Sequence, residues 1–279
     1  MIRRDVTLPD GQPGWLRISQ VDHARLSAEL ASRWGGGQFS PVICSPYDGD
    51  ANPLYGVRNE VLAAICHHDD GWLPWEAAPS IDPDQARLPS FVEMQLPAAI
   101  DIWQRSVLAA ENIGLLAAWV VAGHFLALRE EADSVDQPVS RSWQIDMTGR
   151  RREWLTQWQG LCPERHTRQL ADQALSWLQW FDRLSLWLSL GRLGEYILGK
   201  DPLKNLRRNQ TARFMLVDTD AAAENHLVEV SPWPFLVPEL VLSVPGSRVP
   251  QGMYTSGEQW LSASVSSSQN WRLVPANAW

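Results

Sequence analysis

The chain has 279 residues, of which 45% are hydrophobic and 20% are charged, and its formal net charge is -8. This composition is that of an ordinary globular protein, long enough to bury a substantial core. The acidic balance argues against nucleic acid as the main partner, because phosphate backbones call for a basic surface.

No segment predicts export or insertion into a membrane. The first residues lack the apolar run of a signal peptide, and the apolar stretch at 107–128 is interrupted by Glu111, Asn112 and His124. The three cysteines have neither metal-type spacing nor a disulfide framework. We therefore expect a cytoplasmic protein without a membrane partner, and the sequence leaves its oligomeric state open.

The N-terminal part predicts two short strands followed by a helix. A turn at Pro9–Gly11 separates the strands, and Ser19 is typical of a helix N-cap, with Asp22 three residues on as in a capping box. In the helix that follows, His23 shares a face with apolar residues and so points inward. A single histidine in such a place is more often a satisfied core residue than a ligand.

Residues 36–56 predict a long loop that is rich in Gly, Pro, Asp and Asn. Loops of this length in a compact domain are usually functional or mobile. The loop is either a lid over a site or a surface excursion.

Residues 60–69 predict a helix that leads into the run His67-His68-Asp69-Asp70-Gly71. Val61, Ile65 and Asp69 lie at i, i+4 and i+8, so the carboxylate of Asp69 points where the aliphatic side chains point. A carboxylate that faces a core needs a partner. A bound cation would be such a partner, and it would also explain the two adjacent histidines.

Helices are also predicted at 97–110 and 113–129, followed by a polar connection at 130–152. In the second of these helices His124 lies on an apolar stripe with Val120 and Leu128, so its partner must come from another element.

A long helix is predicted from Pro163 to Leu190. Asp182 lies between Leu178 and Leu186 on its inward stripe, which makes it a second buried carboxylate.

Beyond Gly194 the chain predicts short antiparallel strands, at 213–217, 226–230, 240–244 and 271–274, and the serine-rich residues 262–268 fit turns and edges. We therefore predict a mainly α fold with a small antiparallel β element that the N-terminal strands could join. Its parts are a helical domain at 1–200, which includes the N-terminal strands, and a β-rich C-terminal extension at 201–279.

The pair His68-Asp69, with Asp70-Gly71 after it, resembles the doublet that names the HD superfamily of metal-dependent phosphohydrolases. That superfamily also has a histidine on an earlier helix, further histidines later and an aspartate on a late helix, and the chain offers His23, His124 and Asp182 in this order. The resemblance implies an HD-domain-like helical bundle.

The chain also looks like an uncharacterised bacterial family, a domain of unknown function, that carries His-His-Asp-Asp-Gly-Trp in the middle and Asp-x-Leu-Ser later, here at 182–185. That likeness covers most of the chain and brings no known substrate.

The resemblance to the HD superfamily assigns His23, His68, Asp69 and Asp182 to one metal ion. His67 and His124 would then serve a second ion or bind substrate. This mixed nitrogen and oxygen donor set suits a divalent Fe, Mn, Co, Ni or Zn ion better than calcium.

The expected chemistry is metal-assisted hydrolysis of a small, phosphorylated substrate. Asp70 is the candidate general base, although it could equally cap the turn at Gly71, and His124 is a second catalytic candidate. Arg58, Arg105 or Arg183 could neutralise a phosphate or lie at the surface.

Three alternatives stay open at this stage. His67 rather than His68 could be the ligand, because a helix turns about 100° per residue and both cannot face one ion. A di-iron oxygenase would use similar ligands. The fold could also be a non-catalytic module that binds a metal or another ligand.

Overall fold

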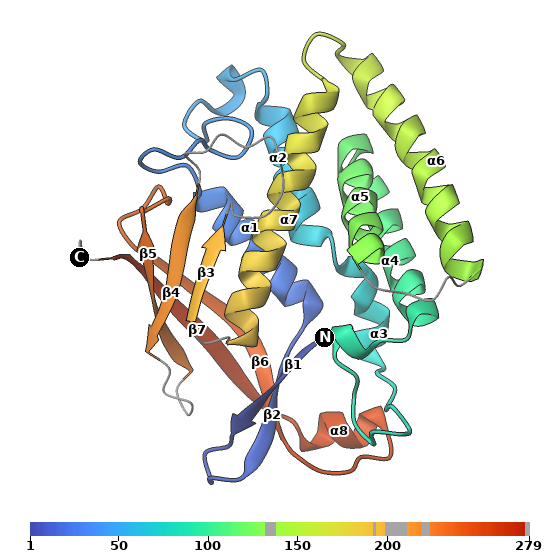
Figure 1. The fold of residues 1–279 in the computed structure, drawn as a ribbon, viewed down its shortest axis with the longest axis vertical. Coiled ribbons are helices and arrows are strands. Elements are labelled where there is room, and N and C mark those ends of the chain that lie inside the picture. The colour runs from blue at the N-terminus through green and yellow to red at the C-terminus, as the bar shows by residue number, and fades with distance from the viewer. Residues whose placement is uncertain (132–137, 192–193, 199–210, 219–223, 277–279) are drawn as a thin grey trace.

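The structure, a computed structural model, describes residues 1–131, 138–191, 194–198, 211–218 and 224–276. The described strands form one curled, seven-stranded sheet in the order β1-β2-β6-β7-β5-β4-β3, and the main helices cover one side of it (Figure 1). The fold is mixed α/β, so the prediction of a mainly α, HD-like helical bundle is wrong. The strands are β1 (Ile2–Thr7), β2 (Pro13–Ile18), β3 (Gly194–Leu198), β4 (Ala212–Asp218), β5 (Asn225–Ser231), β6 (Leu240–Pro250) and β7 (Val265–Pro275).

The sheet is assembled from both ends of the chain. The hairpin of β1 and β2 pairs with β6, where Trp15 lies opposite Val249, and β7 lies between β6 and β5, parallel to β5. Ser266 of β7 pairs with Ser247 of β6, so part of a segment expected in turns and edges lies inside the sheet. The predicted strands at 240–244 and 271–274 are parts of β6 and β7, and serine and proline made the rest of these two strands look like turns.

The helices are α1 (Gln20–Arg33), α2 (Tyr55–His67), α3 (Leu73–Ala77), α4 (Leu96–Glu111), α5 (Leu115–Glu131), α6 (Pro138–Leu161), α7 (Arg168–Leu190) and α8 (Gly257–Ala263). Helix α7 packs against α1, α2 and α5 and also against β1 and β3, whereas α6 lies farthest from the sheet (Figure 1). None of the helices in the described part of the chain is long and apolar enough to cross a membrane.

Tryptophans fill the space between α1, α7 and the sheet. Trp34 is fully buried and makes edge contacts with the rings of Phe39, Trp177, Phe181 and Phe235. A buried aromatic side chain removes about 150–250 Å² from water, which corresponds to about 4–6 kcal/mol of transfer free energy. This packing fixes the separation of α1 and α7, the two helices that carry His23 and Asp182.

The polar connection predicted at 130–152 is largely helical, because residues 138–152 belong to α6. Trp143, Met147, Trp154 and Trp158 of this helix are buried. Their spacing places them along one side of the helix, and the charged residues between them obscured that pattern in the sequence.

The loop at 36–56 joins the end of α1 to the start of α2, so it lies at the ends of these helices remote from His23 and His68 (Figure 1). The backbone amides of Gly35 and Gly36 donate to the carbonyl of Pro234, which fastens the loop to the β5–β6 connection. In this position the loop does not cover the cluster described below.

Candidate metal centre

The start of α1 is fixed by two capping groups. The Ser19 hydroxyl accepts from the backbone amides of Val21 and Asp22, and the Glu76 carboxylate accepts from the amide of Gln20 at 2.9 Å and from the Ser19 hydroxyl. The acid of the capping arrangement is therefore Glu76, from a distant part of the chain, and not Asp22. These bonds set the first turn of α1, from which His23 points into the interior.

Helix α2 ends at His67, two residues earlier than predicted. His68 is its C-cap, and Asp69 has φ -108° and ψ 16°, which is outside the helical range. The chain then approaches α4 so closely that a Cβ at Gly71 would lie 2.1 Å from the carbonyl oxygen of Ile102. Because the backbone leaves the helix here, the adjacent side chains of His68 and Asp69 can face the same point.

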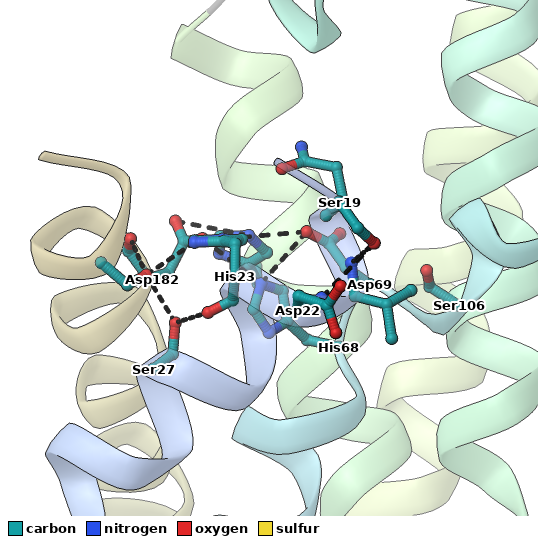
Figure 2. A network of polar contacts seen from close by, with 12 residues as sticks. Ser19, Asp22, His23, Ser27, His68, Asp69, Ser106 and Asp182 are labelled. Carbon is teal, nitrogen blue, oxygen red and sulfur yellow. Dashed lines mark hydrogen bonds and ion pairs between the residues drawn. The ribbon is translucent and has the colours of Figure 1, made fainter. Parts of the chain in front are cut away.

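Four buried side chains from α1, the end of α2 and α7 converge on that point (Figure 2). Asp182 Oδ1 lies 3.0 Å from His23 Nε2 and 3.3 Å from His68 Nε2. Asp69 Oδ2 lies 3.5 Å from His68 Nε2 and 3.9 Å from His23 Nε2. The structure thus brings together His23, His68, Asp69 and Asp182, the ligands that the HD resemblance assigns to one ion.

The other nitrogen of each of these two histidines is held from behind. His68 Nδ1 lies 2.8 Å from the carbonyl oxygen of Ile65, and His23 Nδ1 lies 2.7 Å from the hydroxyl of Ser185. A carbonyl can only accept, so His68 Nδ1 carries a proton, and Nε2 is the atom that can present a lone pair to an ion once it is deprotonated. Metal-ligating histidines are typically held in this way by a second group.

His124 of α5 lies at the edge of the cluster. Its Nε2 is 3.9 Å from Asp182 Oδ2, too long for a hydrogen bond, and its ring lies edge-on to that of His68. Its Nδ1 is buried and has no hydrogen-bond partner among the residues that the structure describes. A buried imidazole in this state calls for a missing partner such as an ion or a bound molecule.

Burial and the neighbouring charges shift the pKa values of several cluster residues. Burial alone would lower the pKa of His68, but the carboxylates of Asp69 and Asp182 outweigh it and raise this pKa to about 9. Burial raises the pKa of Asp69, against the effect of His68 and His23. Burial would also raise the pKa of Asp182, but His124 and the hydrogen bonds with His23 and His68 hold it well below its usual value. Burial lowers the pKa of His124 to about 4, so this ring is neutral at neutral pH.

The donor atoms fit a transition-metal ion. Ligands that lie about 2.0–2.2 Å from one ion are separated by about 3.0 Å when adjacent and by about 4.2 Å when opposed, and the four distances above lie between 3.0 and 3.9 Å. Among the described residues two overlapping sets have their donor atoms within 4.8 Å of one another, namely His23, His68 and Asp69, and His68, His124 and Asp182. Two nitrogen donors with a carboxylate suit Fe, Mn, Co, Ni or Zn.

His67 and Asp70 lie outside this cluster. His67 Nδ1 pairs with Asp70 Oδ2 at 2.9 Å, and the side chain of His67 is 46% exposed. Of the two adjacent histidines only His68 faces the carboxylates of Asp69 and Asp182. The assignment of Asp70 as general base stays a prediction, which this position does not favour.

The three candidate arginines have different surroundings. Arg58 is buried and donates to the carbonyl of Ser32, and Arg105 donates to the carbonyl of Gly71 and pairs with Asp101. Arg183 follows Asp182 on α7, and its charge adds to the effect of burial in lowering the pKa of His124. Of these three arginines, Arg183 is therefore the one whose charge acts on the pKa of a residue at the edge of the cluster.

Three further residues, Ser27, Ser185 and Glu76, had no predicted role, and each holds part of the cluster in place. For the serines a signal was present, because Ser27 is one turn from His23 and Ser185 is three residues from Asp182, on the same helix faces. For Glu76 no local signal exists, since it caps a helix far away in sequence.

A family model described as "Protein of unknown function (DUF3891)" matches residues 1–251, a range that includes every member of the cluster. No curated protein and no solved structure matches the chain.

Proposed function

We propose that this chain, which belongs to the DUF3891 family of proteins of unknown function, is a metal-dependent hydrolase of the HD type that acts on a phosphate ester or nucleotide. In this proposal His23, His68, Asp69 and Asp182 hold one divalent Fe, Mn, Co, Ni or Zn ion. His124 serves a second ion or contacts the substrate. The protein works in the cytoplasm on a small molecule.

The observation that carries the proposal is the convergence of two imidazole Nε2 atoms and two carboxylates in a buried place. Burying two carboxylates is expensive unless positive charge and hydrogen bonds compensate them. His23, His68, Asp69 and Asp182 are each at most 5% exposed. Both imidazoles are held through Nδ1, which leaves Nε2 directed at the carboxylates. A divalent cation would compensate the charge of both carboxylates and accept the lone pairs of both Nε2 atoms.

In the proposed hydrolysis the residues of the chain would have different roles. A divalent ion at such a centre supplies a bound water of lowered pKa and a positive charge for a phosphoryl oxygen. Asp69 and Asp182, each with a second carboxylate oxygen, can accept the proton of a water beside them. His124, which is neutral at neutral pH, places its Nε2 3.9 Å from Asp182 Oδ2, where it can contact the substrate or a second ion.

The phosphorylated class of substrate is supported by the resemblance of the His68-Asp69 doublet to the HD superfamily and by the position of Arg183. A cation next to a ligand aspartate can offset the negative charge of a phosphate group. Arg183 is half-buried, and its charge acts on both His124 and Tyr196.

The test is metal analysis of the purified protein, followed by turnover of phosphatase and phosphodiesterase substrates. We expect about one or two ions per chain and metal-dependent turnover. Asp182→Ala should lose both the bound metal and the turnover. Asp172→Ala is the matched control, because Asp172 lies on the same helix and pairs with Arg168 at the surface.

Each other outcome contradicts the hydrolase. A well-folded protein that binds none of these ions removes the proposal altogether. Bound metal without turnover of any substrate indicates a binding module. Oxygen consumption by the iron-loaded protein indicates the di-iron oxygenase instead.

A further inference from the structure

Behind His23, on the side away from the carboxylates, two buried serines form a hydroxyl pair. Ser27 of α1 and Ser185 of α7 are both fully buried, and their Oγ atoms are 2.7 Å apart. Ser185 Oγ is also 2.7 Å from His23 Nδ1 and 2.9 Å from the carbonyl oxygen of Asp182. Ser27 Oγ is 3.1 Å from the carbonyl oxygen of His23. Figure 2 shows Ser27 beside His23 and Asp182.

Each of the two hydroxyls has one proton to donate. The other hydroxyl and a backbone carbonyl are acceptors within reach. If Ser27 donates to Ser185, then Ser185 donates to the carbonyl of Asp182. If Ser185 donates to Ser27, then Ser27 donates to the carbonyl of His23. In both arrangements Ser185 Oγ turns a lone pair toward His23, so the Nδ1 atom of His23 can donate to it. In a third arrangement Ser185 instead donates to an unprotonated Nδ1 and accepts from Ser27, which leaves the proton of His23 on Nε2.

The proton position on His23 decides whether this residue can bind an ion. With the proton on Nδ1, the lone pair of Nε2 points at the centre. With the proton on Nε2, His23 would donate to Asp182 Oδ1, which is 3.0 Å away, and the ligand atom would be lost. The neighbouring carboxylate favours this second tautomer, so an opposing group is needed behind the ring.

We propose that Ser185, supported by Ser27, is a positioning residue that holds the proton of His23 on Nδ1 and so keeps Nε2 available as a metal ligand. The inference rests on the proposed metal centre and assigns to this hydroxyl pair the role that the backbone carbonyl of Ile65 has for His68. Since Ile65 acts through its backbone, Ser185 is the group that a substitution can remove.

The experiment measures Zn²⁺ affinity of the full chain by competition with a chromophoric chelator. We expect Ser185→Ala to weaken Zn²⁺ binding about 10- to 100-fold, the usual effect of removing such a supporting group. Ser185→Thr keeps the hydroxyl and should stay within about threefold of the unaltered protein. Ser27→Ala removes the hydroxyl that supports Ser185, and its Zn²⁺ affinity should lie between those of the two Ser185 variants.

Ser189→Ala is the matched control. Ser189 lies one turn further along α7, is also fully buried, and its hydroxyl has no partner among the described residues. Its removal should leave Zn²⁺ affinity unchanged. If Ser185→Ala does not fold, Ser185→Cys takes its place, because cysteine has the same shape as serine and its larger sulfur atom is a poor acceptor.

A second measurement reports the tautomer itself. In the metal-free protein, ¹⁵N NMR of the histidine rings should show the Nδ1–H tautomer of His23, and Ser185→Ala should shift His23 toward the Nε2–H tautomer. A change that only loosened the helix packing would not move this proton selectively.

The failure of this inference differs from the failure of the proposed function. If the unaltered protein binds no Zn²⁺ or other transition-metal ion, the proposed centre fails and this role with it. If it binds Zn²⁺ and Ser185→Ala binds equally well, or Ser185→Thr is as weak as Ser185→Ala, the positioning role alone is overturned.

Discussion

His68 and Asp69 belong to a buried cluster, whereas their immediate neighbours His67 and Asp70 form a pair at the surface. The two pairs have the same chemistry and lie in one run of four residues. In the surface pair a single contact of 2.9 Å joins two groups that water also solvates. In the buried pair each group has lost its water and depends on Asp182 and His23. The difference teaches that enclosure, and not residue type, separates the buried cluster from the surface pair.

The largest expected effect concerns the two histidines and the stability of the metal-free protein. His68→Ala should lower the free energy of unfolding by about 3 kcal/mol, because it leaves two buried carboxylates with less compensation. His67→Ala should change it by less than about 0.5 kcal/mol, as is usual for a surface substitution. Urea denaturation measures both values. Equal effects would show that the two histidines are not in different environments.

The two aspartates should differ in metal affinity. Asp69→Ala removes a carboxylate 3.5 Å from His68 Nε2 and should weaken Zn²⁺ binding at least about 100-fold, more than the loss of a supporting group. Asp70→Ala should stay within about threefold, since its partner is His67. Chelator competition gives both constants. A large loss in Asp70→Ala would bring the surface pair into the centre.

Metal affinity should also depend on pH with a definite sign. The pKa of His68 is raised to about 9 in the metal-free protein. Below that pH a second proton occupies Nε2, and this proton must leave when an ion binds. Zn²⁺ binding should therefore weaken by about tenfold for each pH unit between pH 9 and pH 7, and level off above pH 9. His67→Gln should follow the same curve. A curve that is flat between pH 7 and 9 would exclude His68 as the titrating ligand.

The smallest expected effect is at Glu60, a partly buried carboxylate that belongs to neither pair. Its Oε1 accepts from the backbone amides of Leu116 and Ala117 at 2.9 and 3.1 Å, so it caps the start of α5. Glu60→Ala should lower the free energy of unfolding by about 1 kcal/mol and leave Zn²⁺ affinity unchanged. Thermal denaturation is the measurement. Glu111→Ala, which breaks a half-buried ion pair with Arg150, is the control and should have a smaller effect.

Helical periodicity in the sequence placed three members of the cluster on inward faces. His23, His124 and Asp182 each recur with apolar residues at the 3.6-residue period, and all three are buried. This signal is local, because a helix fixes which side chains share a face. The likeness to an uncharacterised family, drawn from the His-His-Asp-Asp-Gly-Trp run, agrees with the family match.

The sheet could not be predicted in the same way. Its strands are short or rich in serine and proline, and β2 pairs with β6 across more than 200 residues of sequence. Such pairing depends on contacts that no local pattern encodes. The mainly α prediction was wrong for this reason.

The sequence by itself determined which helix faces are apolar and which polar side chains interrupt them, because both follow from the spacing of residues along a helix. Only the tertiary structure decided that these side chains meet. The early end of α2 turns Asp69 toward His68, the close approach of α1 and α7 brings Ser185 behind His23, and Glu76 fixes the first turn of α1. Each depends on how separate elements pack, and packing is set by the whole chain rather than by any one segment of it.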